Sequence, residues 1–248
     1  MTILNDIVKN TKAKLVEKKA AVSLDEIKLQ LSRLDLPKGK FKASLAGKAE
    51  AVIAEIKKAS PSAGIISENF DPIQKAREYE DFGAAALSIL TEEDFFLGSN
   101  QYLKDVKAIT SLPILRKDFM VDEYQIYEAK LIGADCILLI ASILSDIEIT
   151  DFVALAEVLE LDYLIEVHDA EELQRVVHFN NALIGVNNRN LKTFEVDINN
   201  SVNLKNSFSG NNIFIAESGI KNKDDMSYLK ERGISVFLIG ESLMRGSF

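Results

Sequence analysis

The stretch Ala51-Val52-Ile53-Ala54-Glu55-Ile56-Lys57-Lys58-Ala59-Ser60-Pro61-Ser62-Ala63-Gly64 begins as an apolar strand and ends in residues that favour neither helix nor strand. Strand side chains alternate between two faces, so Glu55 and Lys57 share a face with Ile53. Parallel strands usually read as unbroken apolar runs, so this pair is either a structural ion pair or an acid and a base lining a pocket. Ser60 to Gly64 favour the pocket, because they predict a mobile loop that brings hydroxyl groups to the end of the strand.

From residue 51 onward, short apolar runs alternate with amphipathic segments of helical length. We expect strands at 51–57, 85–90, 113–117, 136–141, 162–167, 182–187, 212–217 and 236–240. We expect helices between them at 72–82, 99–110, 122–132, 146–160, 169–178, 197–206 and 221–232. This alternation predicts parallel strands with crossover helices. Eight strands favour an α/β fold of the closed (β/α)8 TIM barrel type over an open sheet, since the Gly-rich phosphate turn typical of open sheets is missing.

The first 48 residues predict an N-terminal helical extension, within a single domain of residues 1–248. Phe41 and Leu45 are expected to anchor this extension to the barrel. Apolar residues recur before them at helical spacing and predict two amphipathic helices. These residues are Ile3, Ile7, Leu15, Val16, Leu24, Ile27, Leu31 and Leu34.

Composition narrows the functional classes. The formal net charge of −9 argues against binding to nucleic acid or to an anionic membrane, so an anionic small-molecule ligand must be met by local cations. One cysteine excludes an internal disulfide, and no apolar run approaches the ~20 residues that span a bilayer. Two histidines and one cysteine are too few for the usual zinc sites. We therefore expect a cytoplasmic protein in which metal catalysis through nitrogen or sulfur ligands plays no part, and we also expect a monomer.

Five of the predicted strands end in polar side chains, although strands of this kind are core elements. Because the carboxyl ends of barrel strands lie at one face, these side chains should meet there. Isolated buried charges cost several kcal/mol each and persist only with partners or ligands, so the pattern predicts a site. Besides Glu55 and Lys57, the residues are Lys117, Glu166, Asn187, Arg189, Glu217 and Ser218.

Other polar residues have simpler interpretations. Arg116 and Asp118 flank Lys117 and should face the opposite side, where a structural ion pair is expected. His168 is expected to cap the next helix or to face solvent. Cys136 begins an apolar strand and should behave as a small core residue.

Two glycine-containing turns follow the last two strands. Backbone N–H groups near Gly219, and at the short helix expected after Gly240, are placed where barrels commonly bind phosphate. Each turn is weak evidence alone, and together they indicate a phosphate site.

Several strand-end motifs are more specific. They are Glu55-Ile-Lys57-Lys58-Ala-Ser60-Pro61-Ser62, Phe96-Leu-Gly98-Ser99, Leu115-Arg-Lys117-Asp-Phe119, Glu166-Val-His168, Gly185-Val-Asn187-Asn188-Arg189-Asn-Leu191, Glu217-Ser218-Gly219 and Gly240-Glu241-Ser242-Leu-Met. With these motifs the chain resembles the indole-3-glycerol-phosphate synthase family, the ring-closing, decarboxylating lyases of tryptophan biosynthesis. The resemblance covers nearly the whole length, including the helices before residue 50.

The resemblance implies a substrate, 1-(2-carboxyphenylamino)-1-deoxyribulose 5-phosphate, with a phosphate at one end and an anthranilate carboxylate at the other. Ring closure, loss of carbon dioxide and loss of water need acids, bases and charge positioning, with no metal or redox cofactor. The implied catalytic residues are Glu55, Lys57, Lys117, Glu166, Asn187 and Ser218. The implied substrate-binding residues are Ser60, Phe96, Phe119, Arg189, Leu191, Glu217, Gly219, Leu238, Gly240 and Glu241.

Within these sets, we expect Lys117 to be the general acid of ring closure, with Glu166 holding its ammonium group. Lys57 and Glu55 are expected to serve the later dehydration. Two alternatives stay open. A phosphoribosylanthranilate isomerase expects a cysteine at the end of its first strand, where this chain has Glu55 and Lys57. A non-catalytic phosphate-binding barrel would have no use for the buried acids and bases.

Overall fold

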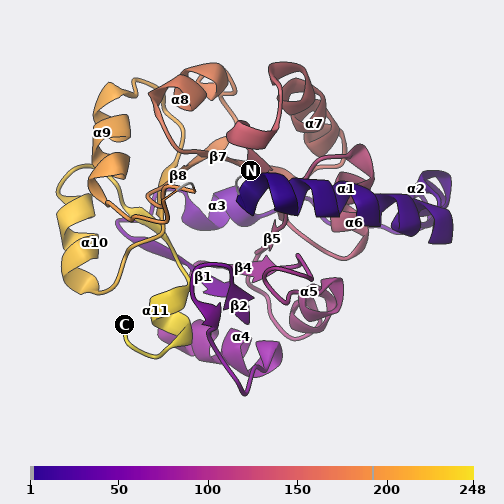
Figure 1. Ribbon diagram of the computed structural model, residues 1–248, viewed down its shortest axis with the longest axis horizontal. Helices are drawn as coiled ribbons and strands as arrows, with labels where there is room; N and C mark the ends of the chain where they lie inside the picture. The colour runs from indigo at the N-terminus through magenta and orange to yellow at the C-terminus, as the bar shows by residue number, and fades with distance from the viewer. Residues whose placement is uncertain (1–2, 192) are drawn as a thin grey trace.

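The computed structural model describes residues 3–191 and 193–248. Within them, eight parallel strands form a closed barrel in the order β1-β10-β9-β8-β7-β6-β5-β4 (Figure 1). The strands are β1 (Ala51–Ile56), β4 (Ala86–Leu90), β5 (Ile114–Lys117), β6 (Cys136–Ile140), β7 (Asp162–Val167), β8 (Leu183–Asn187), β9 (Phe214–Glu217) and β10 (Val236–Ile239). The first strand closes the barrel, because Ala51 is in register with Val236 of β10 and Ile53 with Ala86 of β4. The predicted TIM barrel is confirmed.

Helices alternate with the strands and surround the barrel (Figure 1). Local signals set their ends: Asp71 caps α4 by accepting from the N–H groups of Ile73 and Gln74, and Gly83 ends it with φ of 88°. Every helix in the described residues is too short or too polar to cross a membrane. The helices are α1 (Ile3–Ala21), α2 (Leu24–Leu31), α3 (Phe41–Leu45), α4 (Pro72–Phe82), α5 (Asn100–Lys107), α6 (Glu123–Leu131), the 3-10 turn η1 (Ala141–Ile143), α7 (Asp146–Val158), α8 (Ala170–Val176), α9 (Asn199–Ser207), α10 (Lys223–Lys230) and α11 (Glu241–Met244).

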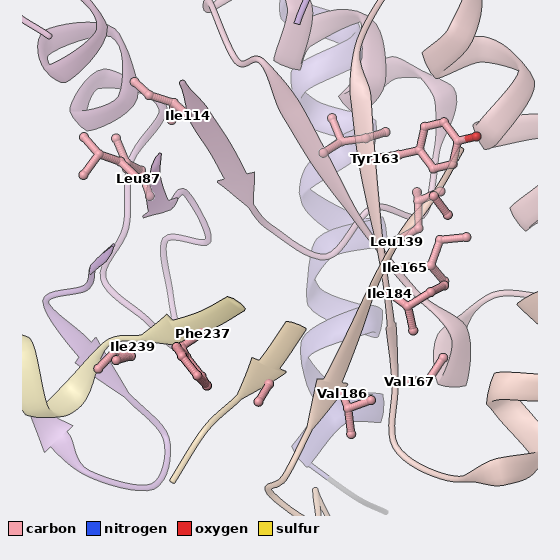
Figure 2. Packing of buried hydrophobic residues seen from close by; sticks show 14 of the residues in the cluster. Leu87, Ile114, Leu139, Tyr163, Ile165, Val167, Ile184, Val186, Phe237 and Ile239 are labelled. Atoms are coloured by element: carbon pink, nitrogen blue, oxygen red, sulfur yellow. The ribbon is translucent and has the colours of Figure 1, made fainter. Parts of the chain in front are cut away.

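The strands bury both of their faces. Along β7, Ile165 and Val167 pack in the layer between barrel and helices, beside Ile184 and Val186 of β8 (Figure 2). The alternate residues point into the barrel, where Leu164 is followed by Glu166 at the carboxyl end. The barrel interior is therefore apolar at its base and charged at its mouth.

Helix α3 fills the base of the barrel. Phe41 and Leu45 are 0% and 2% exposed and pack with the interior residues Leu115 and Cys136. The backbone N–H of Lys42 also donates to the carboxylate of Asp162 at the start of β7. The expected anchoring by Phe41 and Leu45 is confirmed, as is Cys136 as a core residue. Burial raises the pKa of the Cys136 thiol.

Helix α1 crosses the opposite end of the barrel, with its N-terminus near the barrel axis (Figure 1). Further along, Leu15 packs with Ile27 of α2 and Tyr124 of α6. The prediction that Val16 and Leu34 share this apolar face is wrong, since they are 70% and 49% exposed. Neighbouring helical residues differ by 100° in direction, so Leu15 and Val16 cannot both face α6. Leu34 lies beyond the end of α2.

The segment after β1 is more regular than the expected loop. β2 (Ala59–Ser60) and β3 (Gly64–Ile65) form a short antiparallel hairpin. The Ser60 hydroxyl accepts a hydrogen bond from the backbone N–H of Ala63 at 3.2 Å, and Gly64 has φ of 63°. A serine turn and a left-handed glycine therefore close the hairpin.

Truncating the residue at the base of the barrel should cost stability without affecting chemistry. We expect Phe41→Ala to lower the free energy of unfolding by ~3–5 kcal/mol, the usual range for a fully buried phenylalanine. kcat of the folded fraction should not change, because α3 lies at the end of the barrel away from the charged mouth. Urea unfolding and steady-state kinetics measure the two quantities. Phe82→Ala, at a phenylalanine that is 42% exposed, is the matched control; equal losses for both variants would contradict the packing account.

Candidate active site

A cavity of about 590 Å³ opens at the carboxyl ends of the strands. All the residues predicted as catalytic or substrate-binding line it. The start of α1 adds Ile3, Leu4 and Ile7, which the sequence analysis did not assign to the site. The volume suits a small-molecule ligand.

Lys117, at the end of β5, lies between two carboxylates inside the barrel. Its Nζ is 2.9 Å from Glu166 Oε2 of β7 and 2.5 Å from Glu217 Oε2 of β9. The three side chains are almost fully buried, with exposed fractions of 13%, 5% and 3%. The expected Lys117–Glu166 contact is present, and Glu217, predicted only as a binding residue, is a second partner of the ammonium group.

Burial and charge act in opposite directions on this cluster. Burial lowers the pKa of Lys117, but the charges of Glu166, Glu217 and Glu55 together raise it by more, so that the pKa lies above its usual value. Burial raises the pKa of Glu166, and the charges of Lys117 and His168 bring it below the usual value. The pKa of Glu217 is raised, by burial first and also by Glu166. Lys117 is therefore charged, and Glu217 is the carboxylate that protonates more easily.

Gly185 of β8 makes room for this cluster. A Cβ at Gly185 would collide with Glu217 Oε1 and lie 3.3 Å from Leu164. Gly185 was not among the predicted site residues, although a glycine inside a strand often marks a close approach.

Glu55 and Lys57 form a second charged pair, from β1 and the residue just after it. Lys57 Nζ is 2.5 Å from Glu55 Oε1. Gly240 faces this pair: a Cβ there would collide with Glu55 Oε1 and lie 3.2 Å from Lys57 Nζ. Gly240, predicted for its backbone alone, thus also leaves space for two charged side chains.

At the end of β8 and just after it, some side chains line the cavity and one binds a neighbouring loop. Asn187 Nδ2 donates to Glu166 Oε1 at 3.1 Å, and Asn187 Oδ1 accepts from the backbone N–H of Arg189. Asn188 turns away and binds the backbone of Ser201 and Ser218. Asn187 and Arg189 line the cavity, while Asn188 ties its loop to the one after β9.

One side of the cavity is apolar. The rings of Phe96 and Phe119 lie 5.9 Å apart, and Leu138 and Ile140 of β6 continue the wall. Buried Glu92 accepts hydrogen bonds from the N–H groups of residues 94–96, so it fixes the loop that carries Phe96. Leu191 also lines the cavity.

The other side is rich in backbone groups. Ser218 and Gly219 are both left-handed, with φ of 66° and 82°. That conformation is strained for serine, and such strain concentrates at functional positions. The N-terminus of α11 follows at Glu241, whose side chain pairs with Arg245 at 3.1 Å. Ser60 of the hairpin reaches the same cavity.

Two expectations about neighbouring residues have different outcomes. The structural ion pair is confirmed, because Arg116 Nη2 is 3.0 Å from Asp118 Oδ2, away from Lys117. The expectation for His168 is wrong. Asp169 caps α8, and His168 is half-buried between Glu166 and Glu172, because a side chain two residues past Glu166 stays on the same face.

The comparisons with known proteins agree with this geometry. The sequence model of the family described as indole-3-glycerol phosphate synthase matches residues 4–247. The chain is 49% identical to the indole-3-glycerol phosphate synthase of Ruminiclostridium cellulolyticum, over 98% of this chain and 94% of the relative. It is 47% identical to the indole-3-glycerol phosphate synthase of Clostridium acetobutylicum, over 98% of this chain and 92% of the relative.

Two solved structures share the fold at low sequence identity. The N-acetylmannosamine-6-phosphate 2-epimerase of Clostridium perfringens superposes with a TM-score of 0.58 at 14% identity, covering 79% of this chain and 88% of the other. A chain of the tryptophan synthase α2β2 complex of Pyrococcus furiosus superposes with a TM-score of 0.58 at 14% identity, covering 79% of this chain and 89% of the other. At these identities only the barrel is shared.

The barrel fold, together with the family match, defines a (β/α)8-barrel lyase that acts on a phosphorylated small molecule. The chain belongs to the indole-3-glycerol phosphate synthase family. Its reaction is the ring closure, decarboxylation and dehydration of 1-(2-carboxyphenylamino)-1-deoxyribulose 5-phosphate in tryptophan biosynthesis.

Adding one methyl group at Gly240 should disturb the Glu55–Lys57 pair. We expect Gly240→Ala to lower kcat by at least ~10-fold, because a displacement of catalytic groups by about 1 Å can cost 10²-fold. The variant should stay folded, since the clash is with side chains. Steady-state kinetics and circular dichroism measure the two effects. Gly47→Ala, where a Cβ meets nothing within 4 Å, is the control, although its positive φ costs some stability. Unchanged kcat in Gly240→Ala would contradict the close approach.

Proposed function

We propose that the substrate lies across the cavity with its phosphate at the loops after β9 and β10 and its anthranilate ring on the apolar wall. Backbone N–H groups of Gly219, Gly240 and Glu241, with the Ser60 hydroxyl, would bind the phosphate. The Glu241 carboxylate would repel a phosphate, and its pairing with Arg245 supports a role for its amide alone. Phe96, Phe119, Leu191 and Leu238 would contact the rest of the substrate.

Lys117 is the general acid of ring closure in this proposal. As the electron-rich aromatic carbon attacks the ketone carbon, the ammonium group gives a proton to the ketone oxygen. Carbon dioxide then leaves and aromaticity returns. The observation that carries the assignment is the Lys117 ammonium held between Glu166 and Glu217 inside the cavity. Glu166 holds the ammonium in place.

Lys57 and Glu55 serve the dehydration. Lys57 protonates the departing hydroxyl group, which leaves as water, and Glu55 takes a proton from the neighbouring carbon. Their 2.5 Å contact supports this joint role, because an acid and a base this close can act on neighbouring atoms of one substrate. Lys57 also lies near the carboxylate that is lost.

Asn187 and Arg189 orient the anthranilate end, and Ser218 completes the polar wall beside Gly219. The contact of Asn187 with Glu166 and its link to the Arg189 backbone support a joint role. We also infer that the enzyme works in the cytoplasm without metal or cofactor. The −9 charge and the single, buried cysteine are compatible with that location.

The isomerase alternative has no support at the first strand. Its expected cysteine is replaced by Glu55, and Cys136 is fully buried at the start of β6. A non-catalytic barrel would gain nothing from the buried Lys117 cluster.

A crystal soaked in inorganic phosphate tests the orientation of the substrate. The anion should lie within hydrogen-bond distance of backbone N–H groups at Gly219 and at the start of α11. Sulfate at the same place would support an anion site, and Ser60→Ala should weaken it. Phosphate bound only at another part of the cavity would overturn the proposed orientation.

A further inference from the structure

His168 is in contact with the catalytic cluster although it does not line the cavity. Its Nε2 lies 3.4 Å from Glu166 Oε1, and its Nδ1 lies 3.1 Å from Glu172 Oε2. The Nε2 atom is buried and has no hydrogen-bond partner among the described residues. The imidazole ring thus lies between two carboxylates, and any effect on the reaction must act through Glu166.

Hydrogen bonds to the backbone N–H and the carbonyl oxygen of His168 hold the residue in this position. Glu172 Oε2 also accepts the backbone N–H of His168 at 2.8 Å, and Asn200 Nδ2 donates to its carbonyl oxygen at 3.0 Å. Glu172 therefore fixes both the main chain and the side chain. The orientation of Nε2 toward Glu166 is built into the start of α8.

A neutral imidazole fits this environment poorly. It donates a hydrogen bond from one nitrogen and presents a lone pair at the other, so either neutral tautomer would direct a lone pair at a carboxylate. The imidazolium donates from both nitrogens. Glu166 on β7, Glu172 on α8 and Glu217 on β9 are the charged groups that act on the ring, with Asn187 on β8 and Asn200 on α9 uncharged nearby.

The charge of the cluster also favours the imidazolium form of His168. Lys117 faces both Glu166 and Glu217, so the three groups carry one excess negative charge when both carboxylates are ionised. Glu172 beside the ring adds a second negative charge, so a cationic His168 reduces the excess from two to one. Burial lowers the pKa of His168, but the Glu172 hydrogen bond and the charges of Glu166, Glu172 and Glu217 raise it above its usual value.

We propose that His168, held by Glu172, is a positioning residue that stays cationic and pairs through Nε2–H with Glu166, so that Glu166 remains ionised and directed at Lys117. This inference rests on the proposed roles of Lys117 and Glu166. His168 exerts its effect on turnover and not on substrate affinity, because it does not line the cavity.

The pH profile of kcat separates positioning from a purely structural role. As the pH rises through the pKa of His168 the cation is lost, so wild-type kcat should fall on this alkaline limb. Below the pKa of His168, His168→Gln should lower kcat ~10- to 100-fold, which is the value of a hydrogen bond to a charged group. KM should be unchanged, and the fall of kcat at alkaline pH should be absent. Glu172→Gln should move the limb to lower pH. A pH-independent loss in His168→Gln, or an unshifted limb in Glu172→Gln, would overturn the proposal.

A second measurement does not depend on activity. The chain has two histidines, so NMR titration of histidine-labelled protein gives two resonances, which His178→Gln assigns. His168 should titrate above the ordinary ~6.5, and Glu172→Gln and Glu166→Gln should each lower its pKa. Titration at or below ~6.5 in the wild type would refute the cationic pair whatever the kinetics show. If Lys117→Met instead retains turnover, the proposed function fails while the His168 titration stands on its own.

Discussion

Replacing Lys117 with methionine is expected to lower kcat by ~10²- to 10⁴-fold, the usual contribution of a general acid. Methionine keeps much of the side-chain volume but cannot give a proton to the ketone oxygen. KM should change little, because the proposed orientation has the phosphate and the ring elsewhere in the cavity. Single-turnover kinetics should show the block before carbon dioxide release. Near-normal kcat in the folded variant would contradict the assignment, and a loss confined to KM would make Lys117 a binding residue.

The same substitution should change stability in a pH-dependent way. Without the ammonium group, Glu166 and Glu217 lose the cation between them, which costs ~3–5 kcal/mol unless a carboxyl group takes up a proton. The pKa of that carboxyl group is then higher in the folded than in the unfolded chain, so the folded state binds more protons. The free energy of unfolding of the variant should therefore fall as the pH rises through this window. Lys107→Met, which breaks a partly buried pair with Asp135 before β6, should cost stability but leave kcat unchanged.

The second large effect concerns the late step. Glu55→Gln and Lys57→Arg should each slow formation of the indole product ~10²- to 10⁴-fold while carbon dioxide is still released, because acid and base are needed together to remove water. A decarboxylated but still hydrated intermediate should accumulate. Rapid quench followed by mass spectrometry measures both species.

The neighbouring lysine provides the control for this prediction. Lys58 follows Lys57 in a bend after β1, and it does not line the cavity. Lys58→Arg should turn over normally. If Glu55→Gln or Lys57→Arg blocks the reaction before carbon dioxide release, these residues act in ring closure and the division of roles proposed here is wrong.

Strand periodicity made much of the barrel and its mouth predictable. A residue that faces inward at the end of a parallel strand must lie at the common carboxyl face, so Lys117, Glu166 and Glu217 could be brought together from spacing alone. The family motifs then extended the set to loops that carry no periodic pattern, such as Ser60 and Leu191. All of these residues line the same cavity.

Other features depend on tertiary contacts that no local pattern encodes. The apolar residues Ile3 and Ile7 predicted a helix, but the direction of α1 across the barrel mouth depends on packing against α2 and α6. Gly185 looked like an ordinary strand residue, because its need for space comes from Glu217 on the next strand. His168 was misplaced because the start of α8 was judged from capping residues and not from the position of Glu172.

The central claim, that this cavity catalyses ring closure with loss of carbon dioxide, is tested most directly by adding the carboxyphenylamino-deoxyribulose phosphate to the purified protein without added metal. Indole fluorescence and carbon dioxide release are followed together, and the chain has no tryptophan to obscure the product signal. We expect indole product and carbon dioxide to appear in equal amounts, and Lys117→Met to slow the formation of both by the same factor. Indole without stoichiometric carbon dioxide, or no indole from protein shown to be folded, would contradict the account.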